Sequence, residues 1–169
     1  MKSILEKDLV DGCIDNDSRY QKELYRRYCN VMMGVCIRYA PTVQDAEDLL
    51  QDSFIKVFKK IHTYQGKGSL GGWVKKVVVN TCLQFFRDNK NLSMYVELKE
   101  SDFTEEVSFD VLNQLNVDDL KRKIQSLPDG FRIVFNMYAI EGFSHKEISS
   151  ELNISIGTSK SQLSRARAY

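Results

Sequence analysis

The sequence has few of the residue patterns on which enzyme chemistry usually depends. Its 169 residues include two histidines, His62 and His145, and four cysteines that form no CxxC pair. It contains no nucleophile–base pattern, no glycine-rich phosphate loop and no spacing typical of metal ligands. We therefore expect neither an enzyme nor a bound metal or other cofactor.

Long apolar runs are also missing. No segment approaches the length of a membrane span, and the N-terminal stretch MKSILEKDLVDGC lacks the apolar centre of a signal peptide. The cytoplasm is therefore the expected compartment. In a reducing compartment the cysteines should be small hydrophobic core residues rather than disulfide partners or metal ligands. They are Cys13, Cys29, Cys36 and Cys82.

Proline is scarce, and apolar residues recur at helical spacing almost throughout. Pro41 and Pro128 both lie at apparent element boundaries, and no alternating strand pattern or internal repeat is present. The sequence therefore predicts an all-α protein. The predicted helices span residues 3–13, 17–39, 43–64 and 70–88 in the first half, and 117–126, 129–141, 145–152 and 156–169 in the second.

The net charge of +1 conceals an acidic segment near the middle of the chain. Residues 89–116 carry 2 basic and 6 acidic side chains, and their apolar periodicity is weak. A connection of this length without structure is unusual inside one compact domain. We therefore predict two small helical domains, residues 1–90 and 117–169, joined by an acidic linker, residues 91–116.

The second domain ends in two short helices with clear boundary signals. Gly142 can take a positive φ after the preceding helix, and Ser144 with Glu147 matches a capping box. Asn153 suits a left-handed turn, and Ser155 can cap the helix that follows. Two short helices joined by a tight turn, the second basic and free of acids, predict a helix-turn-helix.

The last helix has a packing side and a polar side. The packing side, expected to lie against helix 145–152, consists of Ser159, Gln162, Leu163 and Ala166. The remaining surface carries Lys160, Ser161, Ser164 and Arg165. Such side chains could enter a major groove, where they reach guanine acceptors or phosphates. The alternative is a solvated terminal helix, which the capped helix before it disfavours.

Helix 43–64 combines an apolar stripe with an acidic one. The acids Asp45, Asp48 and Asp52 recur at i, i+3 and i+7, and such a stripe could dock a basic protein surface. Equally, acids near a helix start suit the helix dipole, and Asp52 can pair with Lys56 at i, i+4. The pattern alone favours neither interpretation.

Helix 70–88 aligns a tryptophan with polar side chains. Its apolar side consists of Val74, Val78, Cys82, Phe85 and Phe86. Its opposite side carries Trp73, Lys76, Asn80, Gln84 and Arg87, and the loop before it adds Tyr64, Gln65 and Lys67. An indole ring can stack on the base of an unpaired strand while amides and cations hold base edges and phosphates. The alternative, which periodicity alone slightly favours, is that Trp73 covers the edge of the core.

Three segments together resemble a bacterial sigma factor of the extracytoplasmic-function (ECF) type. Residues 23–61, which include DAEDLLQDSF, are similar to the first half of sigma region two. Residues 68–87, which include GGWVKKVVVNT, are similar to its promoter-melting half. Residues 127–167, which end in GTSKSQLSRAR, are similar to region four. The order of these segments, with an acidic linker between them, makes the resemblance specific.

The resemblance implies a factor that directs RNA polymerase to promoters and helps to open DNA. Region two would bind the β′ clamp helices of the polymerase core through Asp45, Asp48, Gln51 and Asp52. It would capture a flipped base of the minus-ten element through Tyr64, Lys67, Trp73, Lys76, Asn80, Gln84 and Arg87. Region four would lie on the β flap and contact the minus-thirty-five element through Thr158, Lys160, Ser161, Ser164, Arg165 and Arg167. An anti-sigma factor, often membrane-anchored, would mask these surfaces and hold the protein at the inner membrane.

The sequence departs from the family pattern near its end. Ser159 stands where valine is usual, and its hydroxyl can bond a carbonyl one turn back. Gln162 replaces a common arginine, which removes a phosphate contact, and Gln84 lies at a variable position. The family's last helix continues beyond Arg167, whereas this sequence ends at Tyr169, so weaker docking on the β flap is expected.

Two other functions fit parts of the sequence. A stand-alone helix-turn-helix regulator would bind duplex DNA through its last helix and would not need the acids at 45–52. A helical protein-interaction module would use its basic faces for acidic partners and would tolerate the loss of Lys160 or Arg165. The sigma factor ranks first because it accounts for all three segments.

Overall fold

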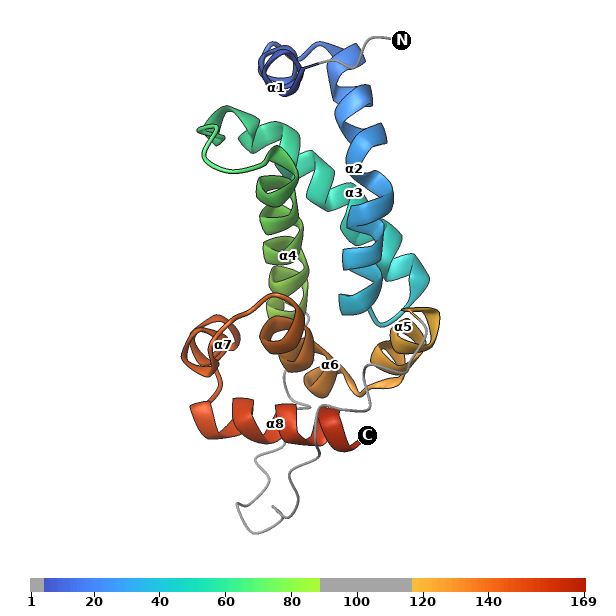
Figure 1. Ribbon diagram of the computed structural model, residues 1–169, viewed down its shortest axis with the longest axis vertical. Helices are drawn as coiled ribbons and strands as arrows, with labels where there is room; N and C mark the ends of the chain where they lie inside the picture. Colours follow the sequence, from blue (N-terminus) through green and yellow to red (C-terminus); the bar gives the residue numbers. More distant parts are fainter. Residues whose placement is uncertain (1–4, 89–116) are drawn as a thin grey trace. The chain divides into compact units, whose positions relative to one another are not determined.

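The computed structural model describes residues 5–88 and 117–169, and every regular element within them is a helix. The chain divides into two compact units, residues 1–84 and 85–169 (Figure 1). The prediction of an all-α protein with two helical parts is therefore confirmed. The predicted linker, residues 91–116, lies outside the described residues. Among the described helices, none is both long and apolar enough to cross a membrane.

The first unit is built on long helices. They are α1 (Glu6–Ile14), α2 (Ser18–Tyr39), α3 (Val43–Lys60), the short 3₁₀ helix η1 (Ile61–Thr63) and most of α4 (Leu70–Asp88). Helices α2 and α3 pack along each other, and α1 packs against both α2 and η1 (Figure 1). The apolar stripe predicted for residues 43–64 is buried from Ala46 to Ile61.

Side-chain caps set the helix starts in this unit. The Asp17 carboxylate accepts from the Arg19 amide at the start of α2, and Thr42 accepts from the Asp45 amide at the start of α3. Each cap satisfies a backbone donor that has no partner inside its own helix. These short connections place α1, α2 and α3 in succession around one core.

Three of the four cysteines are core residues, as predicted, and Cys29 differs from the prediction. Cys13, Cys36 and Cys82 are buried, whereas Cys29 is half-buried. The thiol of Cys82 on α4 hydrogen-bonds to Cys36 on α2, and this bond together with burial raises the pKa of Cys82. The three buried thiols are therefore core residues, and the contact between Cys36 and Cys82 helps α2 and α4 to pack.

The second unit consists of shorter helices. They are α5 (Val117–Ser126), α6 (Asp129–Phe135), the π-helix η5 (Asn136–Ile140), α7 (His145–Leu152) and α8 (Ile156–Ala168). Helix α8 packs against α6 and α7. Ile133, Met137, Ile148 and Leu152 are almost fully buried in the core of this unit.

Buried Arg132 joins the end of α5 to α6. Its side chain is 4% exposed and forms an ion pair with Asp129. Its Nη1 donates to the carbonyl oxygens of Gln125 and Leu127, each at 3.2 Å. A cation held in this way offsets its desolvation through several hydrogen bonds. Arg132 therefore stabilises the turn between two helices.

Three predicted details differ in the structure. Helix 43–64 ends at Lys60 and tightens into η1, where the Thr63 hydroxyl donates to the Lys60 carbonyl. Helix 129–141 changes at Asn136 into a π-helix, which the Glu141 amide closes by donating to the Asn136 carbonyl at 3.0 Å. Phe85, predicted to be buried, is half-buried. Apolar spacing reports which side is buried but not how tightly a turn is wound.

Candidate nucleic-acid and protein interfaces

The polar side of α4 carries the side chains that the sequence assigns to strand binding. Lys76, Asn80 and Gln84 are exposed at successive turns, and Trp73 is half-buried in the first turn. Arg87 lies in the last turn and is half-buried. The buried residues of α4 lie on its other side, so the structure brings these predicted residues together along one side of one helix.

The loop before α4 holds Tyr64 next to Trp73. The centroids of the two rings are 5.8 Å apart, and the ring planes are tilted by 55°. Gly66 and Gly68 have φ values of 69° and 82°, in the region that favours glycine. Lys67 between them is exposed. The loop therefore adds an aromatic ring and a cation to the polar side of α4.

The Tyr64 hydroxyl is tied to the first helix of the chain. Its oxygen lies 2.9 Å from Glu6 Oε1 and 2.8 Å from the Gly68 carbonyl oxygen. The same Oε1 atom of Glu6 accepts from the Leu70 amide at 3.2 Å. Burial, followed by the hydrogen bond to Glu6, raises the pKa of Tyr64. One carboxylate thus contacts both ends of the loop.

The turn between α7 and α8 has the predicted caps. Ser144 accepts from the Glu147 amide, and Glu147 accepts from the Ser144 amide at 2.7 Å, which completes the capping box. Asn153 has a φ of 54°, and Ser155 accepts from the Thr158 amide at 2.9 Å. Gly142 likewise has a positive φ of 79°. These caps fix the angle at which α8 leaves α7.

Helix α8 buries the four residues that the sequence predicts as its packing side: Ser159, Gln162, Leu163 and Ala166. Gln162 is only 2% exposed. It therefore occupies the core of this unit, so a phosphate contact from this position is excluded in this structure. Leu163 and Ala166 give the same side its apolar surface.

The polar side of α8 presents three cations and three hydroxyl groups. Lys160, Ser164 and Arg167 are exposed, and Arg165 is half-buried. Two of the hydroxyl-bearing residues form local bonds, because Thr158 Oγ1 lies 2.9 Å from Ser155 Oγ and Ser161 donates to the Thr158 carbonyl at 2.9 Å. Lys160, Ser164 and Arg167 are therefore the exposed groups on this side of α8.

His145 links three elements of the second unit. Its Nδ1 lies 2.9 Å from Ser159 Oγ on α8, and its ring stacks on Tyr138 with a centroid separation of 4.5 Å. The Arg167 guanidinium lies 6.0 Å from the Tyr138 ring centroid. Burial, followed by the positive charges of Lys160 and Arg167, lowers the pKa of His145.

The predicted polymerase-binding residues lie on α3. Asp48, Gln51 and Asp52 are exposed, whereas Asp45 is half-buried. The Asp45 carboxylate accepts from the Thr42 hydroxyl at 2.6 Å, in addition to the amide bond of the cap. Asp45 therefore has a local structural role, and the three other residues form the accessible part of this face.

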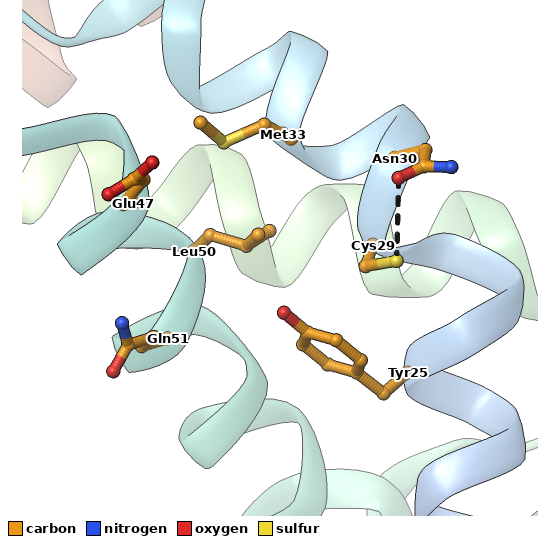
Figure 2. Close-up of a pocket in the computed structure, with 7 residues that line it drawn as sticks. All are labelled: Tyr25, Cys29, Asn30, Met33, Glu47, Leu50 and Gln51. Carbon is orange, nitrogen blue, oxygen red and sulfur yellow. Dashed lines mark hydrogen bonds between the residues drawn. The ribbon is translucent and has the colours of Figure 1, made fainter. Parts of the chain in front are cut away.

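A groove between α2 and α3 adjoins this face. It has a volume of about 360 Å³, and Figure 2 draws its lining. The lining residues are Tyr25, Cys29, Asn30, Met33, Glu47, Leu50 and Gln51. The groove therefore combines apolar and sulfur-containing side chains with a polar rim, and Gln51 belongs both to the groove and to the acidic face.

Sequence patterns did not point to several of these residues. Glu6 is 58 residues away from Tyr64 along the chain, and no local motif signals such a contact. The groove residues Tyr25 and Met33 lie within an ordinary amphipathic helix. Ser159 was predicted to lie on the packing side of its helix, but its hydrogen bond with His145 depends on how α7 and α8 cross.

Two family models match this chain. The family model for Sigma-70 region 2 matches residues 24–92, and the model for Sigma-70 region 4 matches residues 118–169. The chain belongs to the sigma-70 family. Region 2 thus contains α2, α3 and α4, and region 4 contains the helix-turn-helix formed by α7 and α8. A stand-alone helix-turn-helix regulator is not favoured, because region 2 matches as well.

Relatives of this sigma factor include ECF sigma factors. It is 30% identical over 152 residues to the ECF RNA polymerase sigma factor SigE of Mycolicibacterium smegmatis, which covers 86% of this chain and 58% of that protein. It is 24% identical over 184 residues to the ECF RNA polymerase sigma-E factor of Haemophilus influenzae, which covers 98% and 93%. The chain thus spans just over half of the first relative and nearly all of the second.

A solved structure also resembles this sigma factor. The structure is that of the sigma factor RpoE in complex with the anti-sigma factor NepR from Bartonella quintana. It shares 23% sequence identity with a TM-score of 0.48, and it covers 87% of this chain and 91% of that one.

Proposed function

We propose that this sigma factor gives the RNA polymerase core its promoter specificity and helps to open DNA at the minus-ten element. It has no catalytic activity of its own and acts in the cytoplasm, where the polymerase transcribes. The observation that carries this proposal is the presence of two different polar helix sides on two units: one lined by aromatic rings, and one rich in cations and free of acids. The first suits an unpaired strand and the second suits a duplex groove.

The minus-ten element would be bound by α4 and the loop before it. Trp73 and Tyr64 offer ring faces to an extruded base, and Lys67 and Lys76 offer charges to the phosphates. Asn80 and Gln84 can donate to and accept from base edges. Capture of an extruded base favours strand opening because the intact duplex cannot make the same contacts.

The minus-thirty-five element would be bound by α8. Lys160, Arg165 and Arg167 can contact phosphates or guanine acceptors, and the hydroxyls of Ser161 and Ser164 can serve either partner. Thr158, near the start of the helix, would contact the backbone. The α7–α8 caps support this proposal because they orient the helix before DNA arrives, which lowers the entropic cost of binding.

The polymerase core would be bound by α3 and the adjoining groove. Asp48, Gln51 and Asp52 would face basic side chains of the β′ clamp helices, with Asp45 bracing the start of α3. An apolar side chain of the same partner would enter the groove beside Leu50. Region 4 would lie on the β flap. The domains would be residues 1–90 and 117–169, with residues 91–116 as the linker.

Regulation would come from an anti-sigma factor that covers these surfaces. A protein that occupies the groove and the acidic side of α3 would exclude the polymerase core by direct competition. If that protein is membrane-anchored, the sigma factor would be held at the inner membrane until it is released.

A reconstituted transcription assay tests the proposal. Purified sigma factor is mixed with bacterial core polymerase and a library of genomic fragments, and the transcripts are sequenced. We expect start sites that share upstream minus-ten and minus-thirty-five motifs. A lack of both transcripts and core binding would contradict the proposal.

Charge reversal on α3 tests the polymerase-binding surface. The variant Asp48→Lys/Asp52→Lys should lower core affinity by at least roughly tenfold, because close like charges at an interface cost several kcal/mol. The matched control Asp11→Lys/Asp15→Lys makes the same charge change at exposed acids of α1 and its C-cap. Equal core affinity of the two variants would remove α3 from the proposed interface.

A further inference from the structure

The loop that carries Tyr64 has little structure of its own. It runs from Tyr64 to Ser69 between η1 and α4 and includes Gly66 and Gly68, both in left-handed backbone conformations. Glycine gives such a loop many alternative conformations, and ordering each residue costs about 1–2 kcal/mol. Within the loop the Tyr64 hydroxyl donates to the Gly68 carbonyl at 2.8 Å, and contacts from outside the loop add to this one bond.

Glu6 supplies two of these contacts from the first residue of α1. Its Oε1 atom lies 2.9 Å from the Tyr64 hydroxyl at the start of the loop and 3.2 Å from the Leu70 amide at its end. The Leu70 side chain is fully buried, so its amide is a fixed point. The carboxylate thus connects the side chain of Tyr64 to the start of α4.

The position of Tyr64 determines what Trp73 presents to solvent. The two rings have centroids 5.8 Å apart and are tilted by 55°, an arrangement favourable for aromatic pairs. If Tyr64 moved away, Trp73 would gain exposure and rotamer freedom, and a base would then have to order both rings on binding. A preordered pair avoids that entropic cost.

We infer that Glu6 is a positioning residue for the strand-binding surface: its carboxylate holds Tyr64 against Trp73 and fixes the loop before α4. Glu6 lies in α1, before the region 2 match begins at residue 24. The position of Tyr64 is a property of the free protein alone. The effect of Glu6 on strand opening rests on the proposed function.

The first experiment measures the free protein. Trp73 is the only tryptophan, so quenching of its fluorescence by acrylamide reports the Tyr64–Trp73 pair. Amide hydrogen exchange at Leu70 reports the bond from the Leu70 amide to Glu6. In Glu6→Leu we expect Leu70 exchange to accelerate about two- to tenfold, the range that one net hydrogen bond is worth, and Trp73 to be quenched more strongly. Glu6→Gln keeps an acceptor oxygen and should restore both values.

Two further variants separate positioning from general destabilisation. Asp8→Leu removes another acid from the first turn of α1 and should change neither reading. Tyr64→Phe keeps the ring but removes the hydroxyl, so Trp73 quenching should rise while the Leu70 amide stays protected. This variant also tests the inference if Glu6→Leu does not fold. The inference would be overturned by wild-type Trp73 quenching in both Glu6→Leu and Tyr64→Phe, or by wild-type Leu70 exchange in Glu6→Leu.

The second experiment measures strand opening in reconstituted holoenzyme. A 2-aminopurine base in the minus-ten element reports base extrusion, and core affinity is measured in parallel. Glu6→Leu should lower the extrusion signal several-fold at unchanged core affinity. If wild-type protein opens no promoter, the proposed function fails while the fluorescence and exchange results still decide the position of Tyr64. If wild type and Glu6→Leu open promoters equally, the consequence for opening is overturned.

Discussion

The contact between His145 and Ser159 should contribute measurably to the stability of the second unit. Ser159 is fully buried, and its Oγ lies 2.9 Å from His145 Nδ1. Replacing Ser159 by alanine removes this bond, which is worth about 0.5–1.5 kcal/mol net. Alanine has the better helix propensity by about 0.5 kcal/mol. We therefore expect a net destabilisation of at most about 1 kcal/mol.

A double-mutant cycle isolates the bond itself. His145→Phe keeps a ring that can stack on Tyr138 but has no nitrogen to bond Ser159. The coupling between Ser159→Ala and His145→Phe should be about 1 kcal/mol, because both changes remove the same interaction. The helix propensity of alanine cancels in the cycle, because Ser159→Ala is made once with His145 present and once in the His145→Phe variant.

The same histidine should make stability depend on pH. The pKa of His145 is lowered in the folded protein, first by burial and then by Lys160 and Arg167. The unfolded chain therefore binds a proton more readily, so stability rises with pH in this range. The contribution is fully present above pH 6.5, the ordinary value, and is lost as pH falls through the lower folded pKa. His145→Phe should remove this part of the pH dependence.

Urea unfolding followed by NMR tests these expectations. Amide signals of α8 report the second unit, and Trp73 fluorescence reports the first unit as an internal control. Ser159→Ala should lower the α8 midpoint and leave the Trp73 midpoint unchanged. A coupling below about 0.3 kcal/mol, which is within the usual additivity error, or an unchanged pH slope in His145→Phe, would refute the reasoning.

Substitutions at Gly12 and Asn153 and chemical labelling of the cysteines test three other features of the structure. A Cβ at Gly12 would lie 2.3 Å from the Tyr20 ring, so Gly12→Ala should destabilise the first unit by about 1–3 kcal/mol in Trp73-monitored urea unfolding; an unchanged midpoint would contradict this packing. Iodoacetamide at pH 8 should label Cys29 first by mass spectrometry, because burial raises the pKa of Cys13 to about 11; equal labelling rates in folded protein would count against it. Asn153 has a φ of 54°, so Asn153→Ala should lower the free energy of unfolding by about 1 kcal/mol and Asn153→Gly should hardly change it. The α8 amide signals in urea measure both; equal losses of stability would show that the left-handed backbone is not the cause.

The sequence was most informative where contacts are local. Ser144 and Glu147 are three residues apart, and Ser155 caps an amide three residues later. Such motifs depend only on chain geometry that any helix shares. The helix periodicity of α8 likewise identified Ser159, Gln162, Leu163 and Ala166 as its buried side, because 3.6 residues per turn fix which residues share a face.

Contacts between distant segments were not predictable from the sequence. Glu6 and Tyr64 meet only because α1 packs beside η1. Arg132 is buried and bonds carbonyls at the end of α5, and no local motif in the sequence signals this role. Periodicity assigns a residue to a side of its helix, but the identity of its partner depends on how whole helices cross.

The number of cations on α8 sets a limit on how strongly this helix can bind DNA. Three charges, Lys160, Arg165 and Arg167, allow a salt slope no steeper than about −2.7, since each phosphate contact contributes about −0.9. Helix α8 alone would therefore contribute only weak, salt-sensitive binding to duplex DNA. Attachment to a polymerase already engaged elsewhere on the promoter would raise its local concentration into the millimolar range. Under this arrangement, the distance between the two promoter elements becomes a strict requirement, because a tether helps only at the spacing it can reach.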